Sequence, residues 1–246
     1  MKIVAIGGGN YSLDDSNKPY NVEEINKEIV RLANKKHPRF LNIGFNIHSD
    51  YYYSFIKKIF TRLGCQCEYL RFNEFNNEKT VESKFKRADI IFLPGGNTLS
   101  YMKQIRKYGI DKHIYDAAKK DVVLAGISAG AIMCFDAGCS DARKKESDLG
   151  IYLKVKGLGL QKGLIAPHFS NSGRIKDLPR MLKSCRKNTI AFGIDECSAL
   201  VINEDNYKVV KSNDEAKIFK CYYLNDEYMS IELANEGEII SLYQVN

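Results

Sequence analysis

Runs of apolar residues alternate with amphipathic segments over the first half of the chain. Five short apolar runs predict β-strands: Lys2–Ile6, Arg39–Phe45, Cys67–Phe72, Asp89–Leu93 and Val122–Ile127. Between them, apolar side chains that recur every three or four positions predict helices over about 22–35, 50–63 and 78–87, with further helices after the fourth and fifth strands. This alternation predicts an α/β fold, in which helices cover both faces of a parallel sheet.

After about residue 140 the pattern loosens. Strands are predicted over 164–167, 189–194 and 199–202, with a helix over about 174–186. The pattern of the tail from about 204 predicts short antiparallel strands, the last of them over 238–245. Because no proline- or serine-rich linker divides the chain, we expect one domain over 1–246, with a core over about 1–203 and a β-rich tail over 204–246.

Composition and charge narrow the class of protein. The chain has no run of about 18 apolar residues, so it contains no predicted transmembrane helix and no membrane partner is expected. Seven scattered cysteines without zinc-binding spacing favour free thiols, a cytoplasmic location and no metal or other cofactor. The net charge of +7 is spread along the chain, which favours solvated surfaces over a nucleic-acid site.

The segment Gly126-Ile127-Ser128-Ala129-Gly130 has the G-x-S-x-G form of a nucleophile elbow. A buried strand precedes it and a predicted helix follows, so the serine hydroxyl would stand above the end of the sheet. The alternative is a serine that only caps the helix. The strand–turn–helix context favours the catalytic interpretation of Ser128.

A second glycine turn, Pro94-Gly95-Gly96-Asn97-Thr98, follows another buried strand. Adjacent glycines allow backbone N–H groups to point outward, as an oxyanion hole requires. By itself the turn is equally consistent with a helix cap at Asn97 or Thr98. Because ligands of α/β sheets bind beyond the carboxyl ends of the strands, we expect both glycine turns to lie at one edge.

A serine nucleophile needs a base, and the chain has four histidines. His37 and His113 lie in charged helical segments and read as surface residues. His48 follows a strand at the same sheet edge and could line the pocket. His168 follows the apolar run Leu164–Pro167, which makes it the best candidate for the base.

The base needs an acid that orients it, and three carboxylates qualify by position. Asp141 lies downstream of the serine, whereas Asp195 and Glu196 end the predicted strand over 189–194. Sequence spacing alone leaves this choice open. A further glycine run, Gly7–Gly9, lacks the G-x-G-x-x-G and Walker patterns, which argues against a nucleotide site.

Taken together, these residues resemble the aspartyl dipeptidase (peptidase E) family of serine peptidases, which includes the cyanophycinases. The resemblance covers about 1–203 and rests on the order and spacing of several motifs. These are Gly7–Gly9, Pro94–Thr98, Gly126–Ala131, Ser140-Asp141, Pro167-His168-Phe169 and Gly193–Glu196. The resemblance implies a class I glutamine-amidotransferase-like α/β fold, with serine in place of the amidotransferases' cysteine.

By this resemblance Ser128 is the nucleophile and His168 the base. Asp141 is placed first as the acid, since the pair Ser140-Asp141 falls where the family's essential aspartate is expected, and Glu196 is the alternative. The oxyanion donors implied are the backbone N–H of Gly95 or Gly96 and that of Ala129.

The family's dipeptidases cleave after an N-terminal aspartate, which calls for a cation near the substrate carboxylate. Arg174 and Arg180 follow His168 in the sequence, and Arg174 is assigned to the substrate together with Asn97 and Thr98. The expected function is hydrolysis of short peptides through an acyl-enzyme. Two alternatives stay open: a non-catalytic small-molecule or regulatory binding module on the same fold, and an amidase or glutaminase relative.

Overall fold

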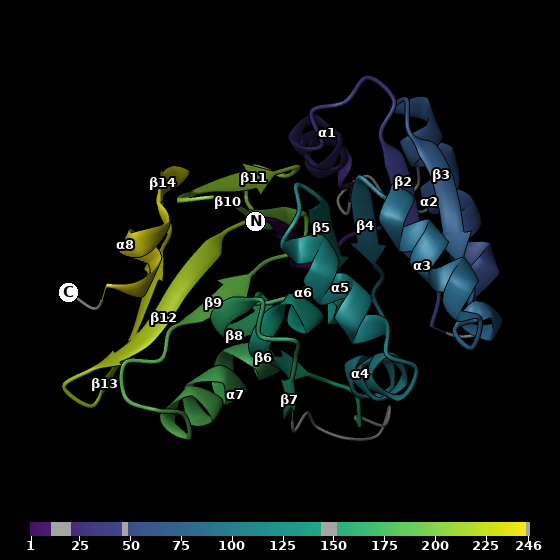
Figure 1. The fold of residues 1–246 in the computed structure, drawn as a ribbon. Helices are drawn as coiled ribbons and strands as arrows, with labels where there is room; N and C mark the ends of the chain where they lie inside the picture. The colour runs from purple at the N-terminus through teal and green to yellow at the C-terminus, as the bar shows by residue number, and fades with distance from the viewer. Residues whose placement is uncertain (11–20, 46–48, 144–151, 245–246) are drawn as a thin grey trace.

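The computed structural model describes residues 1–10, 21–45, 49–143 and 152–244. His48 lies outside the described residues. Within them the chain forms two sheets and eight α-helices (Figure 1). The eight-stranded sheet has the order β14-β11-β10-β1-β5-β4-β2-β3, and the six-stranded sheet has the order β13-β12-β9-β8-β6-β7. The predicted α/β class is therefore confirmed.

The helices and strands follow one another in this order: β1 (Lys2–Ile6), α1 (Glu23–Leu32), β2 (Arg39–Ile43), α2 (Ser49–Arg62), β3 (Gln66–Leu70), a 3-10 turn (Phe72–Glu74), α3 (Glu78–Arg87), β4 (Ile90–Leu93), α4 (Thr98–Lys107), α5 (Ile110–Ala118), β5 (Val123–Ile127), α6 (Ala129–Cys134), β6 (Phe135–Ser140), β7 (Leu153–Lys156), β8 (Gln161–Pro167), α7 (Ser172–Lys183), β9 (Ala191–Ile194), β10 (Ser198–Asn203), β11 (Asn206–Lys211), β12 (Ile218–Leu224), β13 (Glu227–Glu232), β14 (Glu236–Glu238) and α8 (Ile239–Tyr243).

The centre of the large sheet is parallel. Strand β5 pairs with β1 on one side and with β4 on the other, and β2 and β3 continue the parallel part beyond β4. Both faces of β1 are buried: Ile3 and Ala5 belong to one hydrophobic cluster, and Val4 and Ile6 to another. A strand that is apolar at every position can be buried on both faces, which explains why the short continuous runs in the sequence became central strands.

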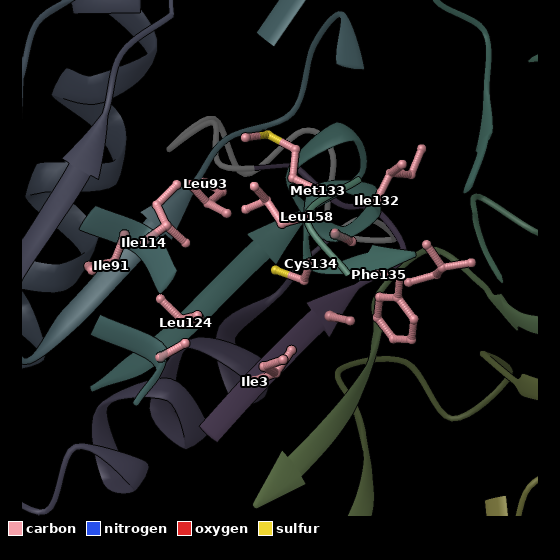
Figure 2. Packing of buried hydrophobic residues seen from close by; sticks show 14 of the residues in the cluster. Ile3, Ile91, Leu93, Ile114, Leu124, Ile132, Met133, Cys134, Phe135 and Leu158 are labelled. Carbon is pink, nitrogen blue, oxygen red and sulfur yellow. The ribbon is translucent and has the colours of Figure 1, made fainter. Parts of the chain in front are cut away.

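The two faces of the large sheet are covered differently. Residues of α1 and α2 pack with Val4, Phe40 and Phe92 on one face. On the other face, residues of α3 to α6 and of the six-stranded sheet share a second cluster, which includes Ile3, Leu124 and Phe135 (Figure 2). The second sheet therefore packs against α6, the helix that begins at the carboxyl end of β5.

The six-stranded sheet carries α7 on its far side. Leu178, Met181 and Leu182 of α7 pack against Leu164 of β8 and Ala191 of β9. Strand β8 is parallel to both β6 and β9, so its carboxyl end and that of β9 point the same way. The sequence pattern did not predict β6 or β7.

The short antiparallel strands predicted after residue 203 are confirmed at β11, β12 and β13, and they are divided between the two sheets. Strands β11 and β14 extend the large sheet beyond β10, whereas β12 and β13 extend the second sheet beyond β9. Each new strand pairs with an edge that would otherwise expose unpaired backbone groups. The C-terminal strands therefore complete both sheets.

The predicted strand over 238–245 is wrong, because Ile239–Tyr243 forms helix α8. Leu242 is fully buried, and Ile239 and Tyr243 pack against the same core, whereas Ile240 is 61% exposed. Apolar contacts at spacings of three and four residues suit a helix, while a strand would place alternate residues on one face.

None of the helices in the described ranges is both long enough and apolar enough to span a bilayer.

Candidate active site

Three loops meet at the carboxyl edge of the parallel sheet. Strands β1, β5 and β4 are neighbours, with Ile6 opposite Ile127 and Leu93 opposite Gly126. The turns that follow these strands therefore lie together, as expected from parallel topology. A Cβ built on Gly95 would lie 3.5 Å from the Cβ of Ser128, so the two predicted glycine turns are in van der Waals reach.

Ser128 occupies a strained turn between β5 and α6. Its φ of 52° and ψ of −110° are unusual for a residue with a side chain, and such outliers gather at functional sites. A Cβ on Gly126 would overlap the backbone of Gly130, and a Cβ on Gly130 would overlap the carbonyl of Leu93. Both glycines of the G-x-S-x-G motif are thus required by close backbone packing.

His168 comes from the other sheet, directly after β8. Its backbone N–H donates to the Gly7 carbonyl at 3.0 Å, and its φ is 53°. This contact brings the imidazole across to the elbow, where Nε2 lies 2.8 Å from Ser128 Oγ. The distance suits a hydrogen bond through which a base takes the hydroxyl proton.

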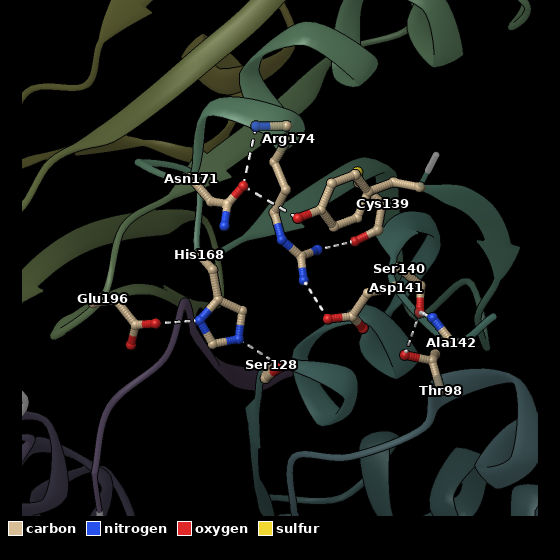
Figure 3. Close-up of polar contacts among 12 residues, drawn as sticks. Thr98, Ser128, Cys139, Ser140, Asp141, Ala142, His168, Asn171, Arg174 and Glu196 are labelled. Atoms are coloured by element: carbon tan, nitrogen blue, oxygen red, sulfur yellow. Dashed lines mark hydrogen bonds and ion pairs between the residues drawn. The ribbon is translucent and has the colours of Figure 1, made fainter. Parts of the chain in front are cut away.

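Glu196 lies on the other side of the imidazole. Its carboxylate Oε1 contacts His168 Nδ1, so Ser128, His168 and Glu196 form a continuous hydrogen-bonded row (Figure 3). The His168 and Glu196 side chains are 29% and 31% exposed, which leaves the row open to solvent. A nucleophile, a base and an orienting acid in this order have the geometry of a catalytic triad.

Asp141 does not contact His168 in the structure. Its Oδ2 lies 3.3 Å from Arg174 Nη2, while the same guanidinium also donates to the Cys139 carbonyl and lies 4.6 Å from the ring centre of Tyr152. The preference for Asp141 over Glu196 as the acid therefore disagrees with the geometry. The reason is topological: Asp141 follows β6 and faces α7, whereas the β9–β10 turn brings Glu196 to the imidazole.

Arg174 and Arg180 lie in different surroundings. The Arg174 side chain is only 4% exposed, because Asp141, Cys139 and Tyr152 surround it. The Arg180 side chain is 60% exposed and pairs with Asp177 within α7. Of the two arginines, only Arg174 contacts Asp141 and Cys139 in the group of polar side chains that Figure 3 shows.

Asn97 and Thr98 hold the start of α4. Asn97 Oδ1 accepts the backbone N–H of Ser100 as an N-cap, and its Nδ2 donates to the Ala142 carbonyl at 2.8 Å. Thr98 is 1% exposed, and its hydroxyl accepts from Ser140 Oγ at 3.2 Å. The prediction that Thr98 contacts substrate does not fit this burial, and both residues connect α4 to the end of β6.

The turn over Gly95 and Gly96 is held from below by Tyr101. The tyrosine hydroxyl donates to the Gly95 carbonyl at 3.0 Å, and a Cβ on Gly96 would overlap that hydroxyl. Gly96 has a φ of 142°, which glycine tolerates more readily than other residues. These contacts fix the turn beside Ser128, where the sequence placed the oxyanion donors.

Cys134, the cysteine nearest to the elbow in sequence, is fully buried at the end of α6. Burial raises the pKa of its thiol to about 12, so the reactive thiolate is scarce near neutral pH. This argues against a cysteine nucleophile. All seven cysteines are free, as expected from their scattered spacing.

Asp195, the third candidate acid, supports the turn that carries Glu196. Its backbone N–H donates to the Lys217 carbonyl, and its Oδ2 accepts the Lys217 backbone N–H at 3.1 Å. Burial raises the pKa of the Asp195 carboxyl, partly offset by that backbone hydrogen bond. Among the residues that the structure describes, no cluster of three or more His, Cys, Asp or Glu side chains has an arrangement that could hold a metal.

Two contributions to the site were not predicted from the sequence. Gly7, which the sequence analysis noted as part of a glycine run without assigning it a role, accepts the backbone N–H of His168 through its carbonyl. Tyr152 packs on the Arg174 guanidinium, although it lies in a segment without clear periodicity. For Gly7, the available signal in the sequence was a run of three glycines at the end of a buried strand. For Tyr152, the sequence offered no signal.

The chain is similar to known peptidases. The chain is 27% identical to the uncharacterized peptidase YgaJ of Bacillus subtilis (strain 168), over 94% of this chain and 96% of that protein. Its fold is similar to the crystal structure of a peptidase from an acI-B1 Actinobacterium, with a TM-score of 0.67, 22% identity, and coverage of 94% of this chain and 96% of the other. A putative peptidase E protein from Listeria monocytogenes EGD-e gives a TM-score of 0.61 at 16% identity, covering 85% of this chain and 98% of that one.

The model of peptidase family S51 matches residues 3–210, which include both glycine turns and the Ser128, His168 and Glu196 positions. This match confirms the resemblance inferred from the sequence motifs. The chain therefore belongs to peptidase family S51.

Proposed function

We propose that this peptidase is of the serine type and hydrolyses short peptides through an acyl-enzyme on Ser128. The observation that carries the proposal is the row of contacts from Ser128 Oγ through His168 to Glu196 at the mouth of a strained elbow. A binding module would need neither a base aligned on a serine nor an acid aligned on that base. The catalytic alternative is therefore favoured over the non-catalytic one.

In the proposed reaction, Ser128 Oγ attacks the peptide carbonyl carbon while His168 Nε2 takes the hydroxyl proton. The backbone N–H groups of Ala129 and of Gly95 or Gly96 stabilise the oxyanion that forms. His168 then gives the proton to the departing amine, which leaves an ester on Ser128. Water, deprotonated by the same imidazole, releases the acid product and restores the serine.

Glu196 is the acid in this proposal. Its carboxylate holds the Nδ1 proton of His168, keeps Nε2 free to accept, and stabilises the imidazolium while it is charged. Asp141 instead neutralises Arg174. In this proposal Asp141 balances the charge of the buried Arg174 side chain, whereas Glu196 orients the base His168.

For the substrate, we propose a preference for an acidic residue at the N-terminal side of the cleaved bond, with Arg174 as the cation that attracts it. Support comes from a guanidinium beside the triad with planar, directional donors. The Arg174 side chain is only 4% exposed and already pairs with Asp141, which is 52% exposed, so a substrate carboxylate reaches the guanidinium only by displacing Asp141. The acidic preference is thus expected to be moderate in the wild type.

The first prediction tests this preference. An Asp-Leu dipeptide is expected to be cleaved about tenfold faster in kcat/KM than Asn-Leu, because the two differ by one charge at similar shape. Asp141→Asn is expected to widen this ratio, since it removes the competing carboxylate. Steady-state kinetics on the two dipeptides measures both effects.

Arg180→Lys is the matched control, because Arg180 lies on the same helix but pairs with Asp177. Arg174→Lys should narrow the Asp-to-Asn ratio, whereas Arg180→Lys should leave it unchanged. Equal kcat/KM for the two dipeptides in the wild type would remove the acidic preference from the proposal and leave the serine peptidase.

Three broader predictions belong to the proposal as well. Residues 1–246 act as one unit, because strands after 203 complete both sheets. The arrangement is of the class I glutamine-amidotransferase-like type. A cytoplasmic location is supported by seven free cysteines, which persist as thiols in a reducing compartment.

A further inference from the structure

The turn after β1 holds the two chain segments that carry the proposed base and acid. The Gly7 carbonyl accepts the His168 N–H, and the Gly8 carbonyl accepts the Cys197 N–H, each at 3.0 Å. The Gly7 N–H in turn donates to the Ser198 carbonyl at 3.0 Å. The short segment after β1 therefore holds both the loop after β8 and the turn between β9 and β10.

Both loops are strained at the residues that this turn binds. His168 has a φ of 53° and Cys197, next to Glu196, has a φ of 59°. Such conformations persist only where surrounding contacts hold them. The Gly7 and Gly8 carbonyls supply contacts of this kind at both residues.

Gly8 differs from Gly7 in the atoms that an added Cβ would overlap. A Cβ there would overlap Glu196 Oε2 and would lie 2.6 Å from Glu196 Cδ and 2.5 Å from His168 Nδ1. A Cβ on Gly7 would instead overlap the backbone carbonyls of Ile194 and Asp195. Gly7 is thus required by the backbone, while Gly8 is required by the two side chains of the triad.

The backbone of Gly8 does not itself demand glycine. Positive φ values occur at Gly9 and at several other glycines, but Gly8 has none. An alanine at this position therefore avoids the penalty of a positive φ, and the nearest atoms that its Cβ would meet belong to Glu196 and His168. This makes the position testable with a single methyl group.

We propose that Gly8 is a positioning residue for catalysis: its bare Cα is the surface against which the Glu196 carboxylate and the His168 imidazole lie. By setting where this pair sits, Gly8 sets the distance from His168 Nε2 to Ser128 Oγ. The inference rests on the proposed function and adds a residue that acts through the triad. It also gives the Gly7–Gly9 run a purpose that does not involve a nucleotide.

The test begins with Gly8→Ala. Its kcat is expected to fall about 100-fold, as displacements of about 1 Å in an active site do, while KM changes less than about threefold. Gly109→Ala is the control, because Gly109 has a φ of 69° and nothing within 4 Å of an added Cβ. That variant should lower the melting temperature and leave kcat unchanged.

A double substitution separates positioning from general damage. Glu196→Asp shortens the acid by one methylene, which withdraws the carboxylate from the methyl group that Gly8→Ala adds. Gly8→Ala is therefore expected to cost at least about tenfold less in the Glu196→Asp background than in the wild type. Gly109→Ala should cost the same in both backgrounds.

If Gly8→Ala alone does not fold, the test compares melting temperatures of variants with and without Gly8→Ala in a background that lacks the overlapped side chains. Adding Glu196→Ala and His168→Ala removes both side chains that the new methyl group would overlap, so the triple variant should fold with a melting temperature close to that of the Glu196→Ala, His168→Ala pair. Failure to fold in that background would show that Gly8 serves the backbone, and would overturn the inference.

Equal costs of Gly8→Ala in the two Glu196 backgrounds would also overturn it, even in an active peptidase. A wild-type chain that cleaves no peptide and binds no serine-directed reagent would instead overturn the proposed function itself. The two failures are therefore distinguishable.

Discussion

Ser128→Ala is expected to lower kcat/KM by about 10⁴-fold or more on any peptide that the wild type cleaves, because the variant has no atom to form the acyl-enzyme. The melting temperature should stay near that of the wild type, since the change removes one oxygen from a turn. Steady-state hydrolysis and thermal unfolding measure the two effects. Ser100→Ala, on the exposed side of α4, is the control serine and should keep full activity.

Ser128→Gly sharpens the same experiment. Glycine removes the hydroxyl and also relieves the positive φ of 52°, which costs other residues about 1–3 kcal/mol. This variant should be as inactive as the alanine variant and more stable than the wild type. Near-normal turnover in either variant would show that the elbow serine is not the nucleophile.

Glu196→Gln is expected to reduce kcat by about 10³–10⁴-fold, more than Asp141→Asn does. An amide at this position can donate its N–H to His168 Nδ1, which holds the imidazole in the tautomer with its proton on Nε2, and it cannot stabilise the imidazolium. Asp141 contacts Arg174 and not His168, so its amide variant should act mainly through KM and the substrate preference. Kinetics of the two variants on one dipeptide gives the comparison.

The matched design of this pair makes the ranking informative, since each change replaces one carboxylate by an isosteric amide. A larger loss of kcat in Asp141→Asn, with Glu196→Gln nearly unaffected, would place the orienting acid at Asp141. The contact between Glu196 and His168 would then be structural only.

Much of the active-site edge was predictable, because local pattern and topology agree there. The continuous apolar run before Ser128 predicts a buried strand, and the flanking glycines predict a tight turn into a helix. Parallel strands bring their carboxyl ends to one edge, so the turn over Gly95–Gly96 had to lie near the serine. The same reasoning placed His168 at the end of a strand.

The choice between Asp141 and Glu196 was not predictable from spacing. It depends on how the second sheet packs on the first, and on which loop the Gly7–Gly8 turn binds. Short strands such as β6 and β7 carry too few apolar residues for a periodic signal. At the C-terminus, Ile239, Leu242 and Tyr243 form a helical stripe in a segment too short for its period to be distinguished from a strand.

The most direct test of a serine nucleophile oriented by Glu196 is covalent labelling with a fluorophosphonate, followed by mass spectrometry of the modified peptide. The wild type should acquire one adduct, on Ser128. Ser128→Ala should acquire none, and Glu196→Gln should be labelled much more slowly than Asp141→Asn. A folded wild-type protein that gains no adduct, or gains one only at another residue, would contradict the account.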